Sequence, residues 1–370
     1  MTDSMTTTTA SATAPLFCLA PHRSRAHVLI LFRSFHADSN PQCHVGLGVC
    51  AMHSVRILRR NGVDAHAFGV WTVDHIRQRL LAYPETTHCV LEAPWVSTAD
   101  TQKLMHDFPR VHFIVRAHSQ IGFLQVEAGA IRILRELLEL QDLSHNLSVA
   151  ANSSHLKNFF EATYAARCLY LPNLYDLDRP PRKSTRVHAD RVLRIASLGA
   201  LRLLKNHTTS AAAALMLARA RRCDLEFYVN DDHEPNAVGI LHALRAMFEG
   251  LRGARLIEQP WQDWSAFRRT VGSMDLCFQL SHTETFNITS ADAVAEGVPC
   301  VVTPAVDWAP KQWQVDTDAV EDAARLGAHL LDAPEGAHDG LIALQRYVAD
   351  ATARWLAYLD GSPTAAASAA

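Results

Sequence analysis

The feature of this sequence that most limits its possible folds is the alternation of short apolar runs with longer stretches of helical pattern. Such alternation is typical of a parallel β-sheet covered by helices, because a parallel strand needs a crossover to reach its neighbour. In the first part of the chain the runs expected to be strands are HVLILFRSF, VDAHAFGV, THCVLEA, VHFIVRA, LSVAAN and ARCLYLP. A turn containing Gly46 and Gly48 is expected to lead from the first run into a helix that ends at Asn61 and Gly62.

A charged, proline-rich stretch divides this alternation into two series. Residues 177–191, LDRPPRKSTRVHADR, show no apolar periodicity and are expected to form a linker. The second series has expected strands at RVLRIASLGA, LEFYVN, ARLIEQ, DLCFQL and PCVVTP. We therefore predict an α/β protein with two Rossmann-like domains, residues 21–176 and 192–337, facing each other across a cleft. A last amphipathic helix, within residues 338–360, is predicted to pack back on the first domain.

Length and composition agree with two soluble domains. The chain has 370 residues, of which 48% are hydrophobic and 20% charged, so it can bury two ordinary cores. No apolar run approaches the ~20 residues that a membrane-spanning helix needs. The amino-terminal residues lack the basic start and long apolar stretch of a signal peptide, and we expect residues 1–20 and 361–370 to be flexible tails.

The cysteines and the net charge narrow the class of protein further. Eight cysteines are scattered without a C-x-x-C pair, which argues against a zinc cage and a disulfide framework. That spread favours reduced, mostly buried thiols and a cytoplasmic location. A formal net charge of −3 argues against a globally basic nucleic-acid binder.

The run HTETFNITSADAVAEGVPCVV, from His282 to Val302, carries two acids eight positions apart. It follows an expected buried strand, so its loop lies at the carboxyl end of a parallel strand, where open α/β sheets bind ligands. The amides near Asn287 and Ile288 would head a helix, a position suited to phosphate. Glu284 and Asp292 could accept hydrogen bonds from sugar hydroxyls. The alternative is an ordinary loop and helix with solvated acids.

A second run, LRIASLGALRLLKNHTT, places two cations beside a helix start. A strand enters a turn at Gly199, Arg202 and Lys205 follow, and a helix begins near Asn206. Cations at this position suit a pyrophosphate, with which they make charge-assisted hydrogen bonds. The alternative is that both are simply solvated, although a lysine there opposes the helix dipole unless an anion is present.

Three segments together resemble a known family. TETFNITSADAVAEGVPCVV is similar to the E-x-F-G-(x5)-E-A-x-A-x-G-x-P-V-V signature of retaining, nucleotide-sugar-dependent glycosyltransferases with the GT-B fold. GALRLLKN resembles the G-R-L-x-x-x-K-N segment of that group, and YLPNLYD resembles its V-x-P-N-G-V-D segment at the domain junction. The three occur in the expected order, and the resemblance covers about residues 27–335.

The resemblance implies a role for each matching residue. Glu284 would contact hydroxyls of the donor sugar, and Asp292 would take the place of the acid that binds the ribose. Lys205 would hold the diphosphate with backbone amides near Asn287 and Ile288. His118, at the end of the strand in FIVRAHSQ, would approach the sugar or its leaving bond.

The chain departs from the family pattern at three positions. The ribose acid is aspartate, at Asp292, where the family has glutamate. The family arginine falls at Ala200, so Arg202 would have to reach across instead, and the family glycine after Phe286 is Asn287.

Five residues are weaker candidates when taken without the resemblance. Gly46 and Gly48 would either touch the ligand or only turn the chain. His118, taken without the resemblance, would equally be a satisfied core or rim residue. Asn230 and Gln259, at the ends of other strands of the second domain, could line a pocket for the base.

The sequence therefore predicts a glycosyltransferase that moves a hexose from a nucleotide diphosphate sugar, with a UDP-sugar expected as donor. Retention at the anomeric carbon is implied by the resemblance alone. The acceptor hydroxyl would belong to a saccharide or a lipid-linked glycan. Neither cofactor nor metal is expected, because cations and helix dipoles supply the pyrophosphate site.

Two rival functions stay open from sequence. A hydroxymethylated base in DNA could be the acceptor, its phosphates bound by basic residues at and after the linker: Arg182, Lys183, Arg186, Arg191 and Arg194. The chain could instead be a non-catalytic protein that binds a nucleotide sugar and signals by domain closure.

Overall fold

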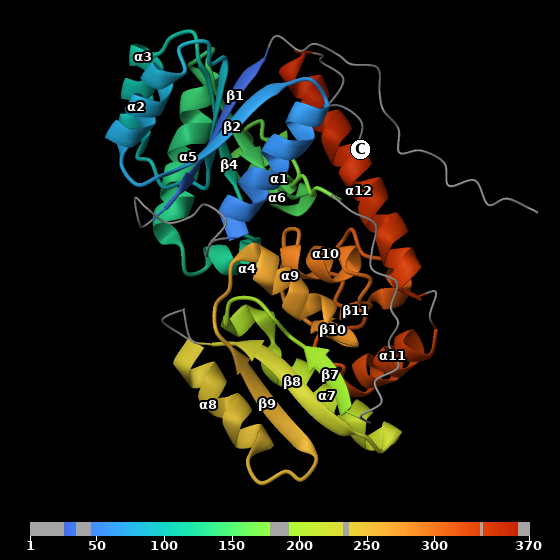
Figure 1. Ribbon diagram of the computed structural model, residues 1–370. Helices are drawn as coiled ribbons and strands as arrows, with labels where there is room; N and C mark the ends of the chain where they lie inside the picture. Colours follow the sequence, from blue (N-terminus) through green and yellow to red (C-terminus); the bar gives the residue numbers. More distant parts are fainter. Residues whose placement is uncertain (1–25, 35–45, 178–191, 232–236, 334–335, 362–370) are drawn as a thin grey trace, which may run out of the picture.

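The computed structural model describes residues 26–34, 46–177, 192–231, 237–333 and 336–361. Two parallel sheets form its two halves, the first above the second in Figure 1. The first sheet has the order β2-β1-β3-β4-β5-β6. Its strands are β1 (His27–Arg33), β2 (Asp64–Val70), β3 (His88–Glu92), β4 (His112–Ala117), β5 (Leu147–Ala151) and β6 (Leu169–Tyr170). Every predicted strand of the first series is present.

Helices on both faces of the first sheet make its crossovers. They are α1 (Gly46–Arg60), α2 (Val73–Ala82), α3 (Thr98–Asp107), α4 (Ile121–Leu124), α5 (Ala128–Asp142) and α6 (Ser154–Tyr164). Side-chain caps explain where several begin: Thr72, Ser97 and Ser153 each accept a hydrogen bond from the backbone amide three residues on.

The predicted glycine turn before α1 is wrong. Gly46 and Gly48 lie in the first turn of the helix itself. Leu47 between them packs against the apolar cluster behind the sheet, so burial extends the helix back over both glycines. The residues that join β1 to α1, 35–45, lie outside the described residues.

The second sheet has the order β11-β10-β7-β8-β9, again parallel throughout. Its strands are β7 (Val192–Ala196), β8 (Asp224–Asn230), β9 (Ala254–Gln259), β10 (Leu276–Gln279) and β11 (Cys300–Val302). The helices around it are α7 (His207–Arg221), α8 (Ala237–Phe248), α9 (Trp264–Gly272), α10 (Ile288–Ala295) and α11 (Val320–Asp332), with short 3-10 turns η1 (Leu203–Lys205) and η2 (Lys311–Trp313). Both sheets agree with the predicted α/β architecture, and the predicted linker falls largely outside the described residues.

The last helix, α12 (Gly336–Leu359), runs along both halves in Figure 1. Trp355 and Leu359 fill the core behind the first sheet, whereas Leu344 belongs to the core of the second. Gly340 lies so close to the Trp313 ring that a Cβ there would come within 2.1 Å of it. The helix therefore packs on both domains at once.

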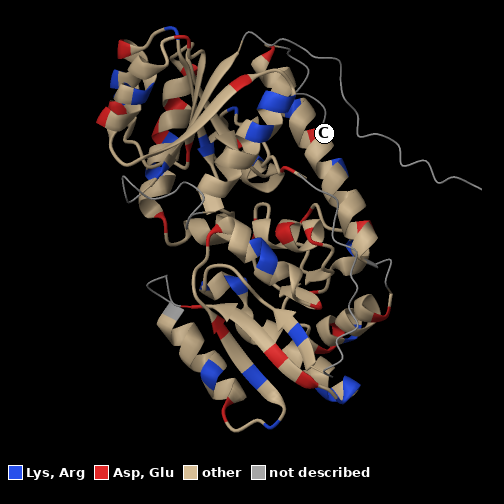
Figure 2. Ribbon diagram, in the orientation of Figure 1, with Lys and Arg blue, Asp and Glu red and all other residues tan. Residues whose placement is uncertain are grey.

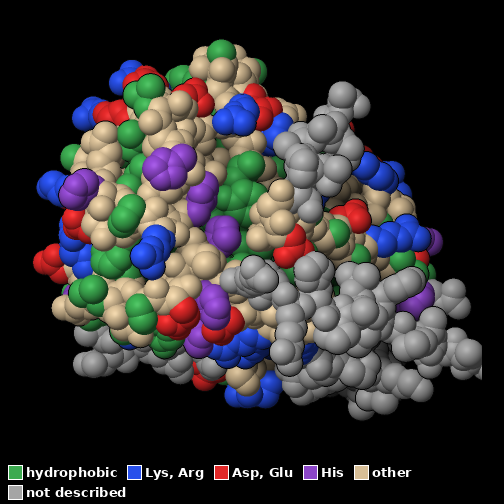
Figure 3. All heavy atoms as spheres, turned by 90° about the horizontal axis from the view of Figure 1, so that it is seen from above, with side chains coloured by type: hydrophobic (Ala, Val, Ile, Leu, Met, Phe, Trp, Pro, Cys, Tyr) green, Lys and Arg blue, Asp and Glu red, His purple; other side chains and the backbone are tan. Residues whose placement is uncertain are grey.

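Histidines mark the amino ends of the first sheet. His27, His66, His88 and His112 lie at or near the starts of four neighbouring strands, and Figure 3, which looks down on this part of the molecule, shows several histidine side chains close together. They have local partners: for example, Asp64 accepts contacts from His27 and His66 at 3.0 and 3.1 Å. The polar groups at this end are thus satisfied by their neighbours.

Two further sequence expectations can be compared with the structure. Of the cysteines in the described part of the chain, Cys223 is partly buried and the rest are buried, and all are free thiols. Cys18 and Cys43 lie outside the described residues. No helix among the described residues is long and apolar enough to cross a membrane.

Candidate active site

Two loops at the carboxyl ends of β7 and β10 meet in the second domain. The amide of His282 donates to the carbonyl of Leu204 at 2.8 Å, which fixes one loop against the other. As a result Lys205, from the loop before α7, lies 2.5 Å from Oε1 of Glu284, from the loop before α10. The structure therefore brings together the two residues that sequence placed at the diphosphate and at the sugar.

Glu284 uses its two carboxylate oxygens unequally. Oε1 accepts from Lys205, from the Ser281 hydroxyl at 2.7 Å and from the Asn287 amide at 3.0 Å. Among the described residues no donor contacts Oε2. The side chain is 10% exposed. One oxygen thus anchors the carboxylate and the other remains able to accept a ligand hydroxyl.

Asn287 shows why the family glycine can be replaced here. Its backbone is left-handed, with φ at 54°, a conformation that asparagine tolerates better than other side chains. Its side-chain oxygen accepts from the Ser290 amide at 2.9 Å and so caps α10. The amides of Ile288 and Thr289 head the same helix, which gives this end of α10 a partial positive charge.

The turn after β7 is held from two sides. Gly199 has φ at 113°, and its amide donates to Oδ1 of Asn230 at 2.8 Å. Gln279 donates to the carbonyl of Leu198 at 2.9 Å. Asn230 therefore supports the turn, and the backbone carbonyl of Gln259 accepts from Asp231 at 2.9 Å at the next strand end.

The first domain reaches these loops through α4. Arg202 stacks over the ring of Phe123, 5.1 Å from its centre. A Cβ on Gly122 would lie 3.2 Å from Thr283, the residue before Glu284. Arg202 is thus engaged with an aromatic ring of the first domain, on the side of the cleft opposite to its own domain.

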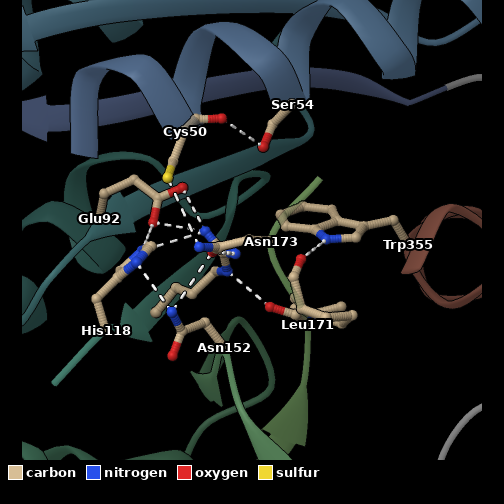
Figure 4. Close-up of polar contacts among 10 residues, drawn as sticks. Cys50, Ser54, Glu92, His118, Asn152, Leu171, Asn173 and Trp355 are labelled. Atoms are coloured by element: carbon tan, nitrogen blue, oxygen red, sulfur yellow. Dashed lines mark hydrogen bonds and ion pairs between the residues drawn. The ribbon is translucent and has the colours of Figure 1, made fainter. Parts of the chain in front are cut away.

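His118 belongs to a buried polar cluster at the carboxyl end of the first sheet (Figure 4). Its Nε2 contacts Glu92, and its Nδ1 lies 3.2 Å from the amide nitrogen of Asn152. The side chain is 11% exposed. Burial lowers the pKa of His118 and Arg116 acts in the same direction, which together outweigh Glu92. The imidazole is therefore neutral near pH 7.

Arg116 and Glu92 form the centre of that cluster. Neither side chain is exposed at all, and Nη1 of Arg116 donates to both carboxylate oxygens at 2.9 Å. Nε of Arg116 donates to the Leu171 carbonyl at 2.8 Å, and Nη2 to Asn173. Burial alone would raise the pKa of Glu92, but Arg116 and His118 bring it to about 2. The carboxylate is thus ionised at every working pH.

Asp292 lies between the domain junction and α9. Its Oδ1 accepts from the Tyr175 hydroxyl at 2.7 Å and from the indole nitrogen of Trp264 at 3.1 Å. The residue is 1% exposed, and burial raises its pKa to about 6. His53 of α1 stacks on Tyr175 and meets Trp264 edge-on, at centroid distances of 4.4 and 4.8 Å. The two protein donors, one at the domain junction and one from α9, thus occupy one carboxylate oxygen of Asp292, the residue assigned to the ribose.

Two of the remaining sequence candidates do not join this site. Gly46 and Gly48 lie in the first turn of α1, in the first domain, and make no hydrogen bond with Lys205 or Glu284. Arg194, one of the basic residues considered for DNA, pairs with Glu226 at 3.1 Å instead of facing solvent freely. The other four, Arg182, Lys183, Arg186 and Arg191, lie outside the described residues. Figure 2 shows acidic and basic residues interspersed over both halves of the described chain.

A surface groove of about 510 Å³ lies elsewhere, between η2 and α11. Gln314, Asp316, Arg325 and His329 are among its lining residues. None of the predicted site residues lines it, so the groove is separate from the candidate site.

Sequence reasoning missed the residues that support His118 and Asp292. A charged Arg116 inside the apolar run VHFIVRA was a usable signal, because an arginine in a buried strand needs a carboxylate partner. Nothing local in the sequence marked Tyr175 or Trp264, whose contacts with Asp292 span 117 and 28 positions.

Comparisons with known proteins establish the fold. Neither a protein-family model nor a curated protein sequence matches the chain. Among solved structures, a sucrose-phosphate synthase from Thermosynechococcus elongatus matches with a TM-score of 0.65 at 14% identity, over 90% of this chain and 98% of that one. Anabaena Alr3699/HepE in complex with UDP matches with a TM-score of 0.61 at 14% identity, over 91% of this chain and 100% of that one. A UDP-forming α,α-trehalose-phosphate synthase from Burkholderia vietnamiensis matches with a TM-score of 0.59 at 10% identity, over 94% and 100%.

These proteins are GT-B glycosyltransferases. The chain therefore has the GT-B fold, as the sequence predicted, with two Rossmann-like domains and the candidate site where their sheets' carboxyl ends face each other.

Proposed function

We propose that this protein is a glycosyltransferase that moves a sugar from a UDP-sugar to a hydroxyl acceptor. The observation that carries the proposal is the Lys205–Glu284 pair, held at 2.5 Å where two helix-leading loops of the donor-side domain meet. Support for the uridine nucleotide comes from neighbours of the same fold, because Anabaena Alr3699/HepE was solved with UDP and with UDP-glucose.

The pair is suited to a ligand that joins an anion to a sugar. In the described structure the Lys205 ammonium contacts Glu284 alone, so it has hydrogens left to donate to a diphosphate. The heading amides of α10 add partial positive charge beside it. Oε2 of Glu284 is free to accept from a sugar hydroxyl, so one anchored pair orients both parts of the donor.

In the proposed reaction the bond between the anomeric carbon and the diphosphate oxygen breaks and a bond to the acceptor oxygen forms. Lys205 and the α10 amides stabilise the negative charge that builds on the departing diphosphate, the kind of electrostatic term that usually dominates. The acceptor hydroxyl passes its proton to a leaving phosphate oxygen on the same face of the sugar. Retention follows from this geometry and belongs to the proposal.

His118 and Asp292 take different places in this scheme. His118 is neutral and lies at the strand end that faces the donor loops, so it suits a sugar hydroxyl better than a phosphate. Tyr175 and Trp264 both donate to Oδ1 of Asp292, so a ribose hydroxyl would be accepted by Oδ2. The acceptor is proposed to be a saccharide or a lipid-linked glycan.

A thermal-shift titration with UDP and a panel of UDP-sugars, followed by product analysis with candidate acceptors, tests the proposal. We expect UDP and at least one UDP-sugar to raise the melting temperature, and transfer or slow hydrolysis to release UDP. Glu284→Gln should bind UDP nearly as well as the parent and release it from the UDP-sugar more slowly, because the side chain is assigned to the sugar.

The outcomes separate the rival functions. Donor binding without turnover would favour a non-catalytic sensor. Binding of DNA that weakens steeply with salt would favour a DNA acceptor. No shift with any nucleotide sugar would exclude the proposed donor.

A further inference from the structure

Two buried asparagines flank strand β5. Asn146 precedes it, and its amide nitrogen donates to the carbonyls of Met105 and Val111, each at 3.4 Å. Asn152 follows it, at the carboxyl end where parallel sheets bind ligands. The same residue type therefore occupies opposite ends of one strand, and only one of the two faces the cleft side of the sheet.

The amide oxygen of Asn152 is left without a partner. The residue is 1% exposed, and Oδ1 makes no hydrogen bond within the described structure. The amide nitrogen lies 3.2 Å from His118 Nδ1 and 3.5 Å from Asn173 Oδ1. Figure 4 shows this nitrogen turned toward the polar cluster and the oxygen turned away from it. A buried acceptor without a donor destabilises the fold, so such a group calls for an explanation.

The neighbours of Asn152 fix which way its amide points. Nε2 of His118 contacts the ionised Glu92 and also lies 3.1 Å from Nη1 of Arg116. The carboxylate is the closer partner and can only accept, so Nε2 carries the imidazole hydrogen and donates it. Nδ1 of the neutral ring is then an acceptor and requires a donor opposite. The amide nitrogen of Asn152 supplies that donor. The same nitrogen lies 3.5 Å from Asn173 Oδ1, which also can only accept a hydrogen bond. The oxygen is thereby excluded from the cluster and is left without a donor.

Asn152 lies at the edge of the first sheet from which α4 reaches the loop of Glu284. Its ring partner, His118, is followed closely by α4, whose Gly122 packs on Thr283 beside Glu284. The residues of this sheet edge and the Glu284 carboxylate therefore converge from opposite domains. A hydroxyl is the group that fits this oxygen. Oδ1 can only accept a hydrogen bond, and no charged side chain among the described residues donates one to it.

We propose that Asn152 binds a hydroxyl of the transferred sugar through Oδ1 and positions His118 through Nδ2. This inference rests on the proposed function and adds a residue on the acceptor-side domain to the donor-sugar site. In this proposal Asn152 contacts the substrate. Its amide nitrogen also stabilises the tautomer of His118 in which Nδ1 is an acceptor.

The test compares Asn152→Ala with Asn146→Ala. Asn152→Ala removes an unpaired acceptor but also the donor to His118 and Asn173, two changes with opposite effects on stability, so its melting temperature should stay close to that of the parent. Its kcat/KM for the UDP-sugar should fall about tenfold, whereas its Kd for UDP alone should not change. Asn146→Ala should show the reverse, a lower melting temperature with kcat/KM unchanged.

A second variant examines the link to His118. Asn152→Asp keeps an acceptor at the same position but replaces the donor to Nδ1 with a carboxylate, which raises the pKa of His118. The pH below which turnover declines should therefore move upward relative to the parent. An unchanged pH profile would show that Asn152 does not set the state of His118.

The outcomes also separate this inference from the proposed function. A parent protein that turns over a UDP-sugar while Asn152→Ala keeps its kcat/KM would overturn the role of Asn152 alone. A parent that neither binds nor turns over any UDP-sugar would overturn both. Equal losses of UDP and UDP-sugar affinity in Asn152→Ala would also remove Asn152 from the sugar site.

Discussion

The molecule contains two cation–carboxylate pairs at the carboxyl ends of its two sheets, and they differ in burial. Arg116 and Glu92, in the first domain, are both fully buried. Lys205 and Glu284, in the second, are 20% and 10% exposed. A buried pair resists the loss of either partner, because the remaining charge stays in a medium of low dielectric. A partly exposed pair can exchange one contact for a ligand.

The two cations also differ in the number of groups that they contact. Arg116 directs Nε, Nη1 and Nη2 to three different partners. Lys205 contacts only Glu284 among the described residues, and that carboxylate keeps one oxygen unused. The comparison suggests that the first pair fixes the architecture under His118 and that the second receives the donor.

The largest expected effect is on stability, from Glu92→Gln. Removing the carboxylate leaves Arg116 buried and charged without its counter-ion, which should lower the free energy of unfolding by about 3–5 kcal/mol. Denaturant unfolding measures the loss. Glu284→Gln is the matched control, because its pair is partly exposed and should change stability by about 1 kcal/mol or less. Similar losses in the two variants would end the distinction between the pairs.

Asp292 extends the comparison to a buried carboxylate whose hydrogen-bond donors are neutral. Its folded pKa of about 6 exceeds the ordinary value of 3.8, so the folded state favours the protonated form. Stability from this group is present below pH 4 and is lost as pH rises through about 6. Asp292→Asn keeps an acceptor for Tyr175 and Trp264 and cannot ionise.

The stability of Asp292→Asn relative to the parent should therefore increase between pH 4 and pH 7, by about 2–3 kcal/mol. Unfolding curves of both proteins at several pH values measure the difference, in which other titrating groups cancel. A difference that does not change with pH would show that Asp292 is ionised normally in the folded protein.

Lys205→Ala should separate binding from stability. The lost contact to a diphosphate is charge-assisted and worth about 1.5–3 kcal/mol, so UDP affinity should fall at least tenfold. The melting temperature should hardly move, because a partly exposed ion pair contributes little. Calorimetric titration with UDP measures the first and a thermal scan the second. Normal UDP affinity would remove Lys205 from the phosphate site.

The smallest expected effect concerns the contact between the domains. Phe123→Leu keeps an apolar side chain on α4 but removes the ring under Arg202, a cation–π contact worth about 0.5–1 kcal/mol. The KM for the UDP-sugar should change by no more than about fivefold, with kcat nearly constant. A larger change, or a change in kcat, would place Arg202 in the chemical step itself.

Much of the fold could be predicted from sequence because parallel strands are buried on both faces and read as continuous apolar runs. The same reasoning locates ligand loops at strand ends, which is how Lys205 and Glu284 were chosen although 79 positions separate them. The predicted start of α1 was too late in the chain, because local propensity assigns Gly46 and Gly48 to a turn. Burial of Leu47 between them stabilises the helix at these positions instead.

The hydrogen bonds that hold the site residues in place could not be predicted from the sequence. Glu92, Arg116 and Asn152 each end or interrupt an apolar run, but their mutual hydrogen bonds depend on the neighbouring order of β3, β4 and β5. The hydrogen bonds from Tyr175 and Trp264 to Asp292 depend on how the two domains are placed, and no local sequence pattern predicts that placement.

The position of α12 has a consequence for how the protein is made. Ala351, Trp355 and Leu359 fill the core behind the first sheet, and the indole nitrogen of Trp355 donates to the carbonyl of Pro172 at 2.8 Å. During synthesis the first domain emerges first but lacks these side chains until nearly the whole chain has left the ribosome. The half of the molecule that is translated earliest is therefore completed last, with its apolar surface exposed to chaperones in the interval.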